Sequence, residues 1–146
     1  MEGTTPMTGT QQLGELEVGQ VVAERDLALT RDSLVRYAGA SGDFNPIHYR
    51  DDVAESVGLP GVLAHGMLTM GVAVQPVVDW VGPARILDYQ VRFTRPVVVD
   101  PETGAALHVV AKVARVDEGS ARIDLTVTVG EQTVLGKAQV VVATDR

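Results

Sequence analysis

The sequence predicts an α+β fold in which an antiparallel sheet wraps round a long buried helix. Residues 64–81 form the longest apolar run and are apolar nearly all round, which is typical of a helix enclosed by other elements. From residue 85 onward, apolar and polar residues alternate in four segments separated by short turns, which predicts strands. A sheet with one apolar face can bury such a helix by curling round it.

The segments before the apolar run predict a strand followed by a helix. Residues 18–30 are rich in β-branched side chains and form the first expected strand. Thr30 can cap a helix that ends at Gly39 and Gly42, and Asp32 suits the positive end of its dipole. The expected apolar stripe of this helix consists of Leu34, Val35 and Ala38.

A stiff loop and a second short helix come next. Pro46 fixes its own φ and favours an extended conformation at Asn45, so residues 42–46 form a rigid turn. Residues 51–57 then predict a short helix with Asp51 as its cap, and residues 58–61 predict a loop. Within the apolar run, Pro76 is expected to bend or shorten the helix, which ends at Gly82 and Pro83.

The second half of the chain predicts four strands. They cover residues 85–94, 105–116, 121–129 and 133–142. The third alternates most clearly, with Ile123, Leu125, Val127 and Val129 on one face. Turns are expected at residues 117–120 and 130–131, and consecutive hairpins would make the sheet antiparallel.

Length and composition limit the class of protein. The 146 residues suit one domain, and we expect a flexible tail over residues 1–14 and the domain over residues 15–146. The first residues lack the basic and apolar regions of a secretory signal, and no run suits a membrane span. The absence of cysteine excludes disulfides and is compatible with the expected cytoplasmic location. A formal charge of −7 argues against nucleic acid as a partner.

One stretch, residues 41–71, carries the candidate chemistry. Asp43 precedes His48 by five residues in the stiff loop, and we interpret the two as an acid/base pair. The imidazole of His48 suits the base because its ordinary pKa lies near neutral pH. Asp43 suits the acid, or a partner that holds the water, if burial raises its pKa. Gly66 opens the apolar helix, where free backbone N–H groups can hold an anion.

Other residues of this stretch have more modest expectations. Asn45, His65 and Met67 are assigned to substrate binding, although Asn45 is expected mainly to hold the loop and His65 to cap or pack. Asp43 alone could equally be a turn-forming residue. Asp43, His48 and His65 could in principle bind a metal, but we predict neither a metal nor a cofactor. The third histidine, His108, is expected on the sheet surface.

The segments YAGASGDFNPIH and HGMLTMG, followed by RFTRPV, resemble the MaoC-like (R)-specific hydratase and dehydratase family of hot dog folds. The closest resemblance is to the catalytic B subunit of actinobacterial (3R)-hydroxyacyl-carrier-protein dehydratases of type II fatty-acid synthesis. It implies a dimer with sheets joined edge to edge, and syn addition or loss of water on an acyl-CoA or acyl-carrier-protein thioester. The D…H pair of that family corresponds to Asp43 and His48 here.

Two other functions remain open. A hot dog thioesterase shares the scaffold, because a fold alone does not determine function. A catalytically silent acyl-binding subunit of a heterodimeric dehydratase is the second alternative, and either a homodimer or a heterodimer is compatible with the sequence. Arg85, Arg92 and Arg95 are the candidate contacts for a CoA phosphate or an acidic carrier protein.

Overall fold

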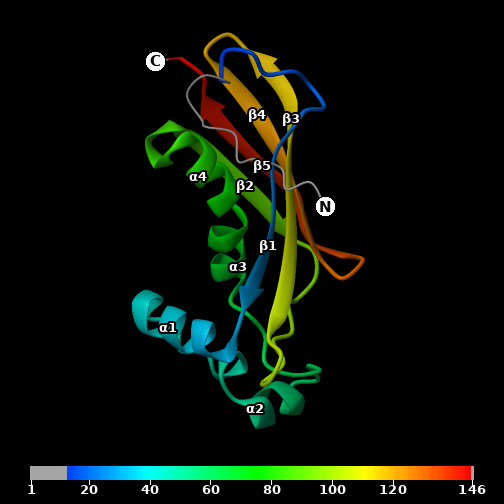
Figure 1. The fold of residues 1–146 in the computed structure, drawn as a ribbon. Helices are drawn as coiled ribbons and strands as arrows, with labels where there is room; N and C mark the ends of the chain where they lie inside the picture. Colours follow the sequence, from blue (N-terminus) through cyan, green and yellow to red (C-terminus); the bar gives the residue numbers. More distant parts are fainter. Residues whose placement is uncertain (1–12, 146) are drawn as a thin grey trace.

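The computed structural model describes residues 13–145, so most of the predicted tail lies outside the described residues. A five-stranded antiparallel sheet forms one layer, and two consecutive helices lie along one of its faces (Figure 1). The strand order is β1-β3-β4-β5-β2. The strands are β1 (Val21–Leu29), β2 (Ile86–Phe93), β3 (Ala105–Asp117), β4 (Ser120–Val129) and β5 (Gln132–Ala143). This arrangement is a hot dog fold, as the resemblance implied.

The pairing of β2 differs from the prediction. Strands β3, β4 and β5 form the expected consecutive hairpins, whereas β2 pairs with β5, with Tyr89 opposite Val140. The first strand, β1, pairs with β3 at the opposite edge. The segment between β2 and β3 makes an isolated bridge from Val98 to Leu63 instead of a tight turn. This segment carries the chain from β2, at one edge of the sheet, to β3, which lies next to the strand at the opposite edge.

The core lies between one face of the sheet and the helices. In β4, Ile123, Leu125 and Val127 are buried, while the alternating positions are partly or fully exposed. The same period of two appears in β3 from Ala105 to Val113. The predicted alternation is thus confirmed, and Trp80 and Val77 of the helical layer pack against this face.

The apolar run forms two helices, α3 (Gly66–Ala73) and α4 (Gln75–Val81), with the break at Val74. Pro76 has no N–H to donate to the preceding turn, so the run does not form the predicted single helix. The prediction that the proline bends or shortens the helix is confirmed. Two side chains satisfy carbonyls near the break. Tyr89 Oη donates to the Met70 carbonyl at 2.7 Å, and Gln75 Nε2 donates to the Gly71 carbonyl at 3.2 Å.

The helical layer is also less enclosed than predicted. Met67 of α3 leaves 60% of its surface exposed, while Thr69 and Ala73 on the other side of the helix are buried. A single sheet covers only one side of a helix, so the opposite side stays open in the single chain. None of the helices among residues 13–145 is both long and apolar enough to cross a membrane.

The helices α1 (Arg31–Ser41) and α2 (Asp51–Ser56) lie at one end of the sheet (Figure 1). Thr30 caps α1 as predicted, in a reciprocal pair of hydrogen bonds with Ser33. Gly42 ends the helix with a φ of 77°, which glycine adopts without strain. Val35 is exposed, so the predicted apolar stripe narrows to Leu34 and Ala38.

The predicted cap of α2 is wrong by one residue. Arg50 occupies the capping position without a side-chain hydrogen bond, and Asp51 is the first helical residue. The Asp51 carboxylate instead accepts two hydrogen bonds from Arg31, at 2.7 and 3.1 Å. Arg31 Nε also donates to the Val99 carbonyl at 2.6 Å. One guanidinium group therefore joins α1, α2 and the segment after β2.

Candidate active site

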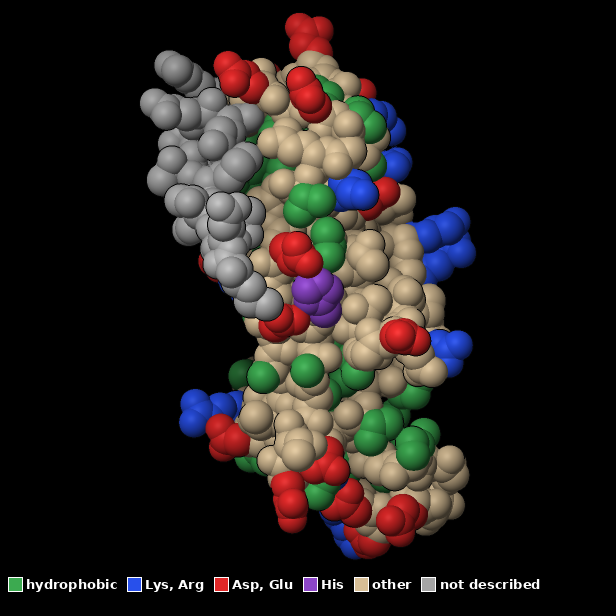
Figure 2. All heavy atoms as spheres, turned by 45° about the vertical axis from the view of Figure 1, so that its right-hand side comes forward, with side chains coloured by type: hydrophobic (Ala, Val, Ile, Leu, Met, Phe, Trp, Pro, Cys, Tyr) green, Lys and Arg blue, Asp and Glu red, His purple; other side chains and the backbone are tan. Residues whose placement is uncertain are grey.

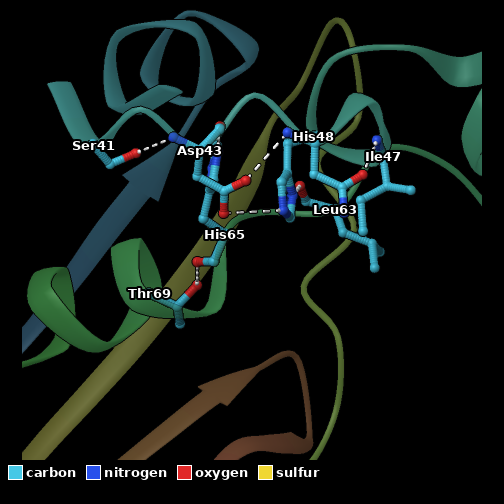
Figure 3. Close-up of polar contacts among 8 residues, drawn as sticks. Ser41, Asp43, Ile47, His48, Leu63, His65 and Thr69 are labelled. Carbon is cyan, nitrogen blue, oxygen red and sulfur yellow. Dashed lines mark hydrogen bonds and ion pairs between the residues drawn. The ribbon is translucent and has the colours of Figure 1, made fainter. Parts of the chain in front are cut away.

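The two carboxylate oxygens of Asp43 have different partners. Oδ1 accepts a hydrogen bond from the Asn45 backbone N–H at 3.1 Å, which forms a turn of the kind expected for an Asp in this loop. Oδ2 lies 4.0 Å from Nε2 of His48. The backbone N–H of Asp43 donates to Ser41 Oγ (Figure 3). The same residue thus shapes the loop with one oxygen and faces the imidazole with the other.

The short 3-10 helix η1 (Pro46–His48) positions His48. Asn45 Oδ1 caps it by accepting from the Ile47 N–H at 3.2 Å, and Pro46 stands at its first position. His48 Nδ1 lies 2.7 Å from the Leu63 carbonyl. Because a carbonyl only accepts, Nδ1 carries the hydrogen and Nε2 presents its lone pair towards Asp43.

His65 lies against both members of this pair (Figure 3). Its Nε2 is 3.1 Å from the Asp43 carbonyl, and its ring stacks on His48 with centroids 3.9 Å apart. Only 1% of the residue is exposed. It occupies the capping position of α3 but makes no side-chain cap bond, so the packing role is confirmed and the capping role is wrong. Burial lowers its pKa, and the hydrogen bond to Asp43 opposes that shift only in part.

A cavity of about 330 Å³ opens beside His48. The first turn of α3, the end of β2 and the start of β5 form its walls, which are mostly apolar. Lining residues include Gly66, Thr69, Phe93, Arg95, Val134 and Leu135. The Gly66 N–H makes no backbone hydrogen bond within residues 13–145, as expected for the first residue of a helix. A Cβ at Gly66 would meet the Phe93 ring at 3.1 Å.

The cluster of Asp43, His48 and His65 has the spacing of a metal site, since its possible ligand atoms lie within 4.8 Å of one another. The two imidazoles are nearly parallel, with an angle of 23° between their planes. A histidine binds a metal through a lone pair in the plane of its ring. Two stacked rings cannot direct such lone pairs at one ion, so the geometry of these three side chains does not suit a metal.

The remaining predicted residues lie in different places. Asn45 supports the loop through the bonds described above and does not line the cavity. Met67 also lies outside the cavity lining. Their roles as substrate contacts stay predictions. Of the candidate phosphate contacts, Arg85 uses its guanidinium group to donate hydrogen bonds to the Ala143 and Asp145 carbonyls. Arg95 instead lines the cavity.

Three residues around the Asp43–His48 pair were not predicted from the sequence. Tyr37 of α1 meets the His65 ring edge-on, with centroids 4.7 Å apart. Thr69 Oγ1 donates to the His65 carbonyl and also lines the cavity. The Leu63 carbonyl holds His48. Tyr37 could have been found from its place three residues after the buried Leu34 of α1, but a backbone carbonyl has no signal in the sequence.

The fold and the site define a hot dog domain in which a histidine lines an apolar cavity and has a carboxylate 4.0 Å from its imidazole. Residues 15–134 match the family model described as a MaoC like domain. The chain therefore belongs to the MaoC-like domain family.

Curated relatives and solved structures agree with this family. The chain is 38% identical over 81 residues to 3-hydroxyacyl-thioester dehydratase X of Mycobacterium tuberculosis, an alignment that covers 53% of this chain and 27% of that protein. A solved MaoC-like dehydratase matches with a TM-score of 0.87 and 32% identity, over 95% of this chain and 43% of that one. The R-hydratase PhaJ1 of Pseudomonas aeruginosa matches with a TM-score of 0.78 and 28% identity, over 92% and 86%. The alignment with 3-hydroxyacyl-thioester dehydratase X thus covers only about a quarter of that protein's length.

Proposed function

We propose that this chain is a hydro-lyase that interconverts (3R)-hydroxyacyl thioesters and enoyl thioesters. The observation that carries the proposal is the 4.0 Å separation of Asp43 Oδ2 from Nε2 of His48, a residue that lines an apolar cavity. Removing water across two adjacent carbons needs one group that accepts a proton and another that donates one. The family and the named relatives support the same reaction.

In the dehydration direction, His48 Nε2 takes the proton from C2 of the substrate. The C3–O bond breaks, and the leaving hydroxide takes a proton from Asp43 and departs as water. Both protons move on the same face, because the two side chains approach the substrate from one side. His48 then carries an extra proton and Asp43 has lost one. A water between Nε2 and Oδ2 returns that proton and resets the pair.

The loss of the C2 proton places negative charge on the thioester oxygen. The Gly66 N–H, at the start of α3, is the donor that we assign to this oxygen. Partial positive charge at a helix N-terminus favours the same anion. Because Gly66 has no side chain, the substrate can approach its backbone closely.

The cavity supports an acyl group as the part of the substrate that is buried. Its walls come from Leu63, Val97, Val134 and Leu135, and Phe93 stands at the Gly66 side. Arg95 lines the same cavity and is the candidate partner for a phosphate of CoA or of an acyl carrier protein. We also propose a cytoplasmic location, which suits a CoA or carrier-protein thioester as the substrate.

A second hot dog subunit is the proposed partner. Strand β2 is an edge strand, and Leu87 and Phe93 on it are 60% and 55% exposed. An unpaired strand edge that carries apolar side chains favours association with another sheet. Size-exclusion chromatography with light scattering measures the mass of the assembly and distinguishes a monomer from a dimer. Mixing with a candidate second subunit distinguishes a homodimer from a heterodimer.

Crotonyl-CoA and (R)-3-hydroxybutyryl-CoA are the substrates that test the proposal. The ultraviolet absorbance of the conjugated enoyl thioester falls on hydration and rises on dehydration. We expect both changes with the purified chain, and no release of free thiol. Thiol release without a change in unsaturation would instead establish the thioesterase alternative. No reaction with CoA or carrier-protein thioesters, alone or with a second subunit, would contradict the proposal.

A further inference from the structure

His65 is the most deeply buried of the three polar side chains in the interior of the described chain, with His48 and Thr69 as the others. Proton transfer between Asp43 and His48 makes no use of it. A buried imidazole loses its contacts with water, and each of its nitrogens needs a partner to compensate. Within residues 13–145, Nε2 has a partner and Nδ1 has none. The structure therefore keeps a costly group at this position.

The hydrogen bond from His65 reaches the backbone of the acid. Nε2 lies 3.1 Å from the carbonyl oxygen of Asp43, a residue 22 positions earlier in the chain. A carbonyl accepts, so Nε2 carries the hydrogen and Nδ1 is the bare nitrogen. The Asp43 side chain is itself 51% exposed and makes no hydrogen bond to His65. Its backbone is thus fixed from inside the domain, while its half-exposed carboxylate lies beside His48 Nε2.

The ring of His65 supports the base at the same time. It stacks on His48 at a centroid distance of 3.9 Å, and Tyr37 contacts it in a T-shaped arrangement at 4.7 Å. The His48 ring can turn only about its Cβ–Cγ bond, and both the hydrogen bond to the Leu63 carbonyl and the stacked His65 ring oppose that rotation. The stack thus helps to keep Nε2 directed towards Asp43.

The neutral form of His65 suits this task. Its ring faces three titratable groups, namely Tyr37, His48 and Asp43. A second positive charge beside His48 would oppose the proton that His48 must accept in each turnover. Protonation would also leave a buried Nδ1–H without an acceptor among the described residues. His65 therefore stays uncharged while its neighbour gains and loses a proton.

We propose that His65 is the positioning residue of the site, which sets the relation of Asp43 to His48 by binding the backbone of one and stacking on the ring of the other. The proposal rests on the proposed hydro-lyase reaction for its kinetic consequences. Its structural part concerns the free protein and can be measured without any substrate.

Two substitutions separate the two contacts. His65→Phe keeps a flat ring in contact with Tyr37 and His48 and removes the hydrogen bond to Asp43. His65→Gln keeps a side-chain N–H donor and removes the ring. His108→Phe is the matched control, because His108 lies on the outer face of the sheet, away from the cavity. We expect each His65 variant to lower kcat about ten- to a hundredfold with KM changed less than about threefold, and the control to match the parent.

Nuclear magnetic resonance tests the structural part. We expect the imidazole nitrogens of His65 to show the neutral Nε2–H form between pH 6 and 8. In His65→Phe, the carbonyl carbon of Asp43 should shift because its hydrogen bond is lost. An imidazolium at His65 in the parent protein overturns the proposal, even if neither variant folds. Folded variants with an unchanged kcat and an unmoved Asp43 carbonyl signal overturn it as well.

Failure of the proposed reaction has a different signature. In that case the parent protein is inactive on every thioester while the resonances of His65 and Asp43 still report the tautomer and the hydrogen bond. If His65 only stabilised the fold, its variants would lower the melting temperature and leave kcat per folded molecule unchanged. That result would also contradict the proposal.

Discussion

Asp43 Oδ2 and His48 Nε2 lie 4.0 Å apart, which is too far for a direct hydrogen bond and close enough for one water to join them. The lone pair of Nε2 faces the carboxylate, because Nδ1 is committed to the Leu63 carbonyl. A proton or a water between the two groups is therefore stabilised from both sides. This relationship is the basis of the first prediction.

His48→Ala and Asp43→Asn should each lower kcat for hydration of crotonyl-CoA by about a hundred- to ten-thousandfold, because each removes one proton-transfer group. Asn at position 43 retains the oxygen that accepts from the Asn45 N–H, so the loop should keep its shape. Absorbance assays measure kcat, and circular dichroism checks the fold. His108→Ala, on the outer face, is the control, and near-parental activity in the two site variants would contradict the assignment.

Gly66→Ala should lower kcat/KM by at least about tenfold, which corresponds to roughly 1.4 kcal/mol of transition-state stabilisation. The new methyl group would lie 3.1 Å from the Phe93 ring and displace it at the cavity wall beside the proposed donor. Gly71→Ala in the same helix is the matched control, because nothing lies within 4 Å of its added Cβ. We expect the control to keep its activity and to gain a little stability, as Gly-to-Ala changes inside helices do. Equal activity in the two variants would remove Gly66 from the site.

Arg31→Ala should destabilise the fold by about 1.5–3 kcal/mol, the range for hydrogen bonds of a charged group. Arg31 is only 22% exposed and bonds both Asp51 and the Val99 carbonyl. Arg36→Ala, in the same helix, removes an exposed ion pair with Asp32 and should cost less than about 0.5 kcal/mol. Urea unfolding gives both free energies. Similar values for the two variants would show that the buried contacts of Arg31 add nothing.

His108 should make stability depend on pH. His108 bonds Asp26 at 2.7 Å and Glu24 at 2.9 Å. Figure 2 shows histidine at the surface with acidic side chains beside it. The hydrogen bond to Asp26, followed by that to Glu24, raises the pKa of His108 above its ordinary value near 6.5. The folded state then holds the proton more tightly than the unfolded chain does.

Because folding raises the pKa of His108, its contribution to stability decreases as the pH rises. The contribution of His108 is fully present below about pH 6.5 and is lost as the pH rises through the raised pKa of the folded state. Urea unfolding of the parent and of His108→Gln at pH 6 and pH 8.5 tests it. The parent should be the more stable of the two at pH 6, and the difference should shrink at pH 8.5. A difference that grows with pH would contradict the assignment.

Local signals predicted much of this fold. The cap at Thr30, the left-handed end of α1 at Gly42 and the alternation of β4 all follow from residues close together in the chain. The partner of β2 could not be predicted in this way. An edge strand pairs according to which surface remains available after the other hairpins form, and its own sequence carries little of that information.

In the candidate site, too, local features were predicted from the sequence and contacts between distant residues were not. The Asp43–His48 spacing and the position of Gly66 at the start of a helix were visible in the motif. The structure places Asp43 Oδ2 4.0 Å from His48 Nε2 and Gly66 at the first position of α3, while their catalytic roles stay predictions. The acid role assigned to Asp43 assumed a buried side chain. In the single chain, that side chain is 51% exposed. The role of His65 depends on ring stacking between residues 17 positions apart, which no local pattern encodes.

The lining of the cavity has a consequence for how the protein matures. The acid/base loop completes its own turn within a few residues, whereas Val134 and Leu135, which close the cavity, come from the last strand. On a ribosome the reactive pair therefore emerges long before the wall that would hold an acyl chain. A chain truncated before β5 would carry Asp43 and His48 and lack the wall that Val134 and Leu135 provide, so we expect binding of an acyl chain only once β5 has been made.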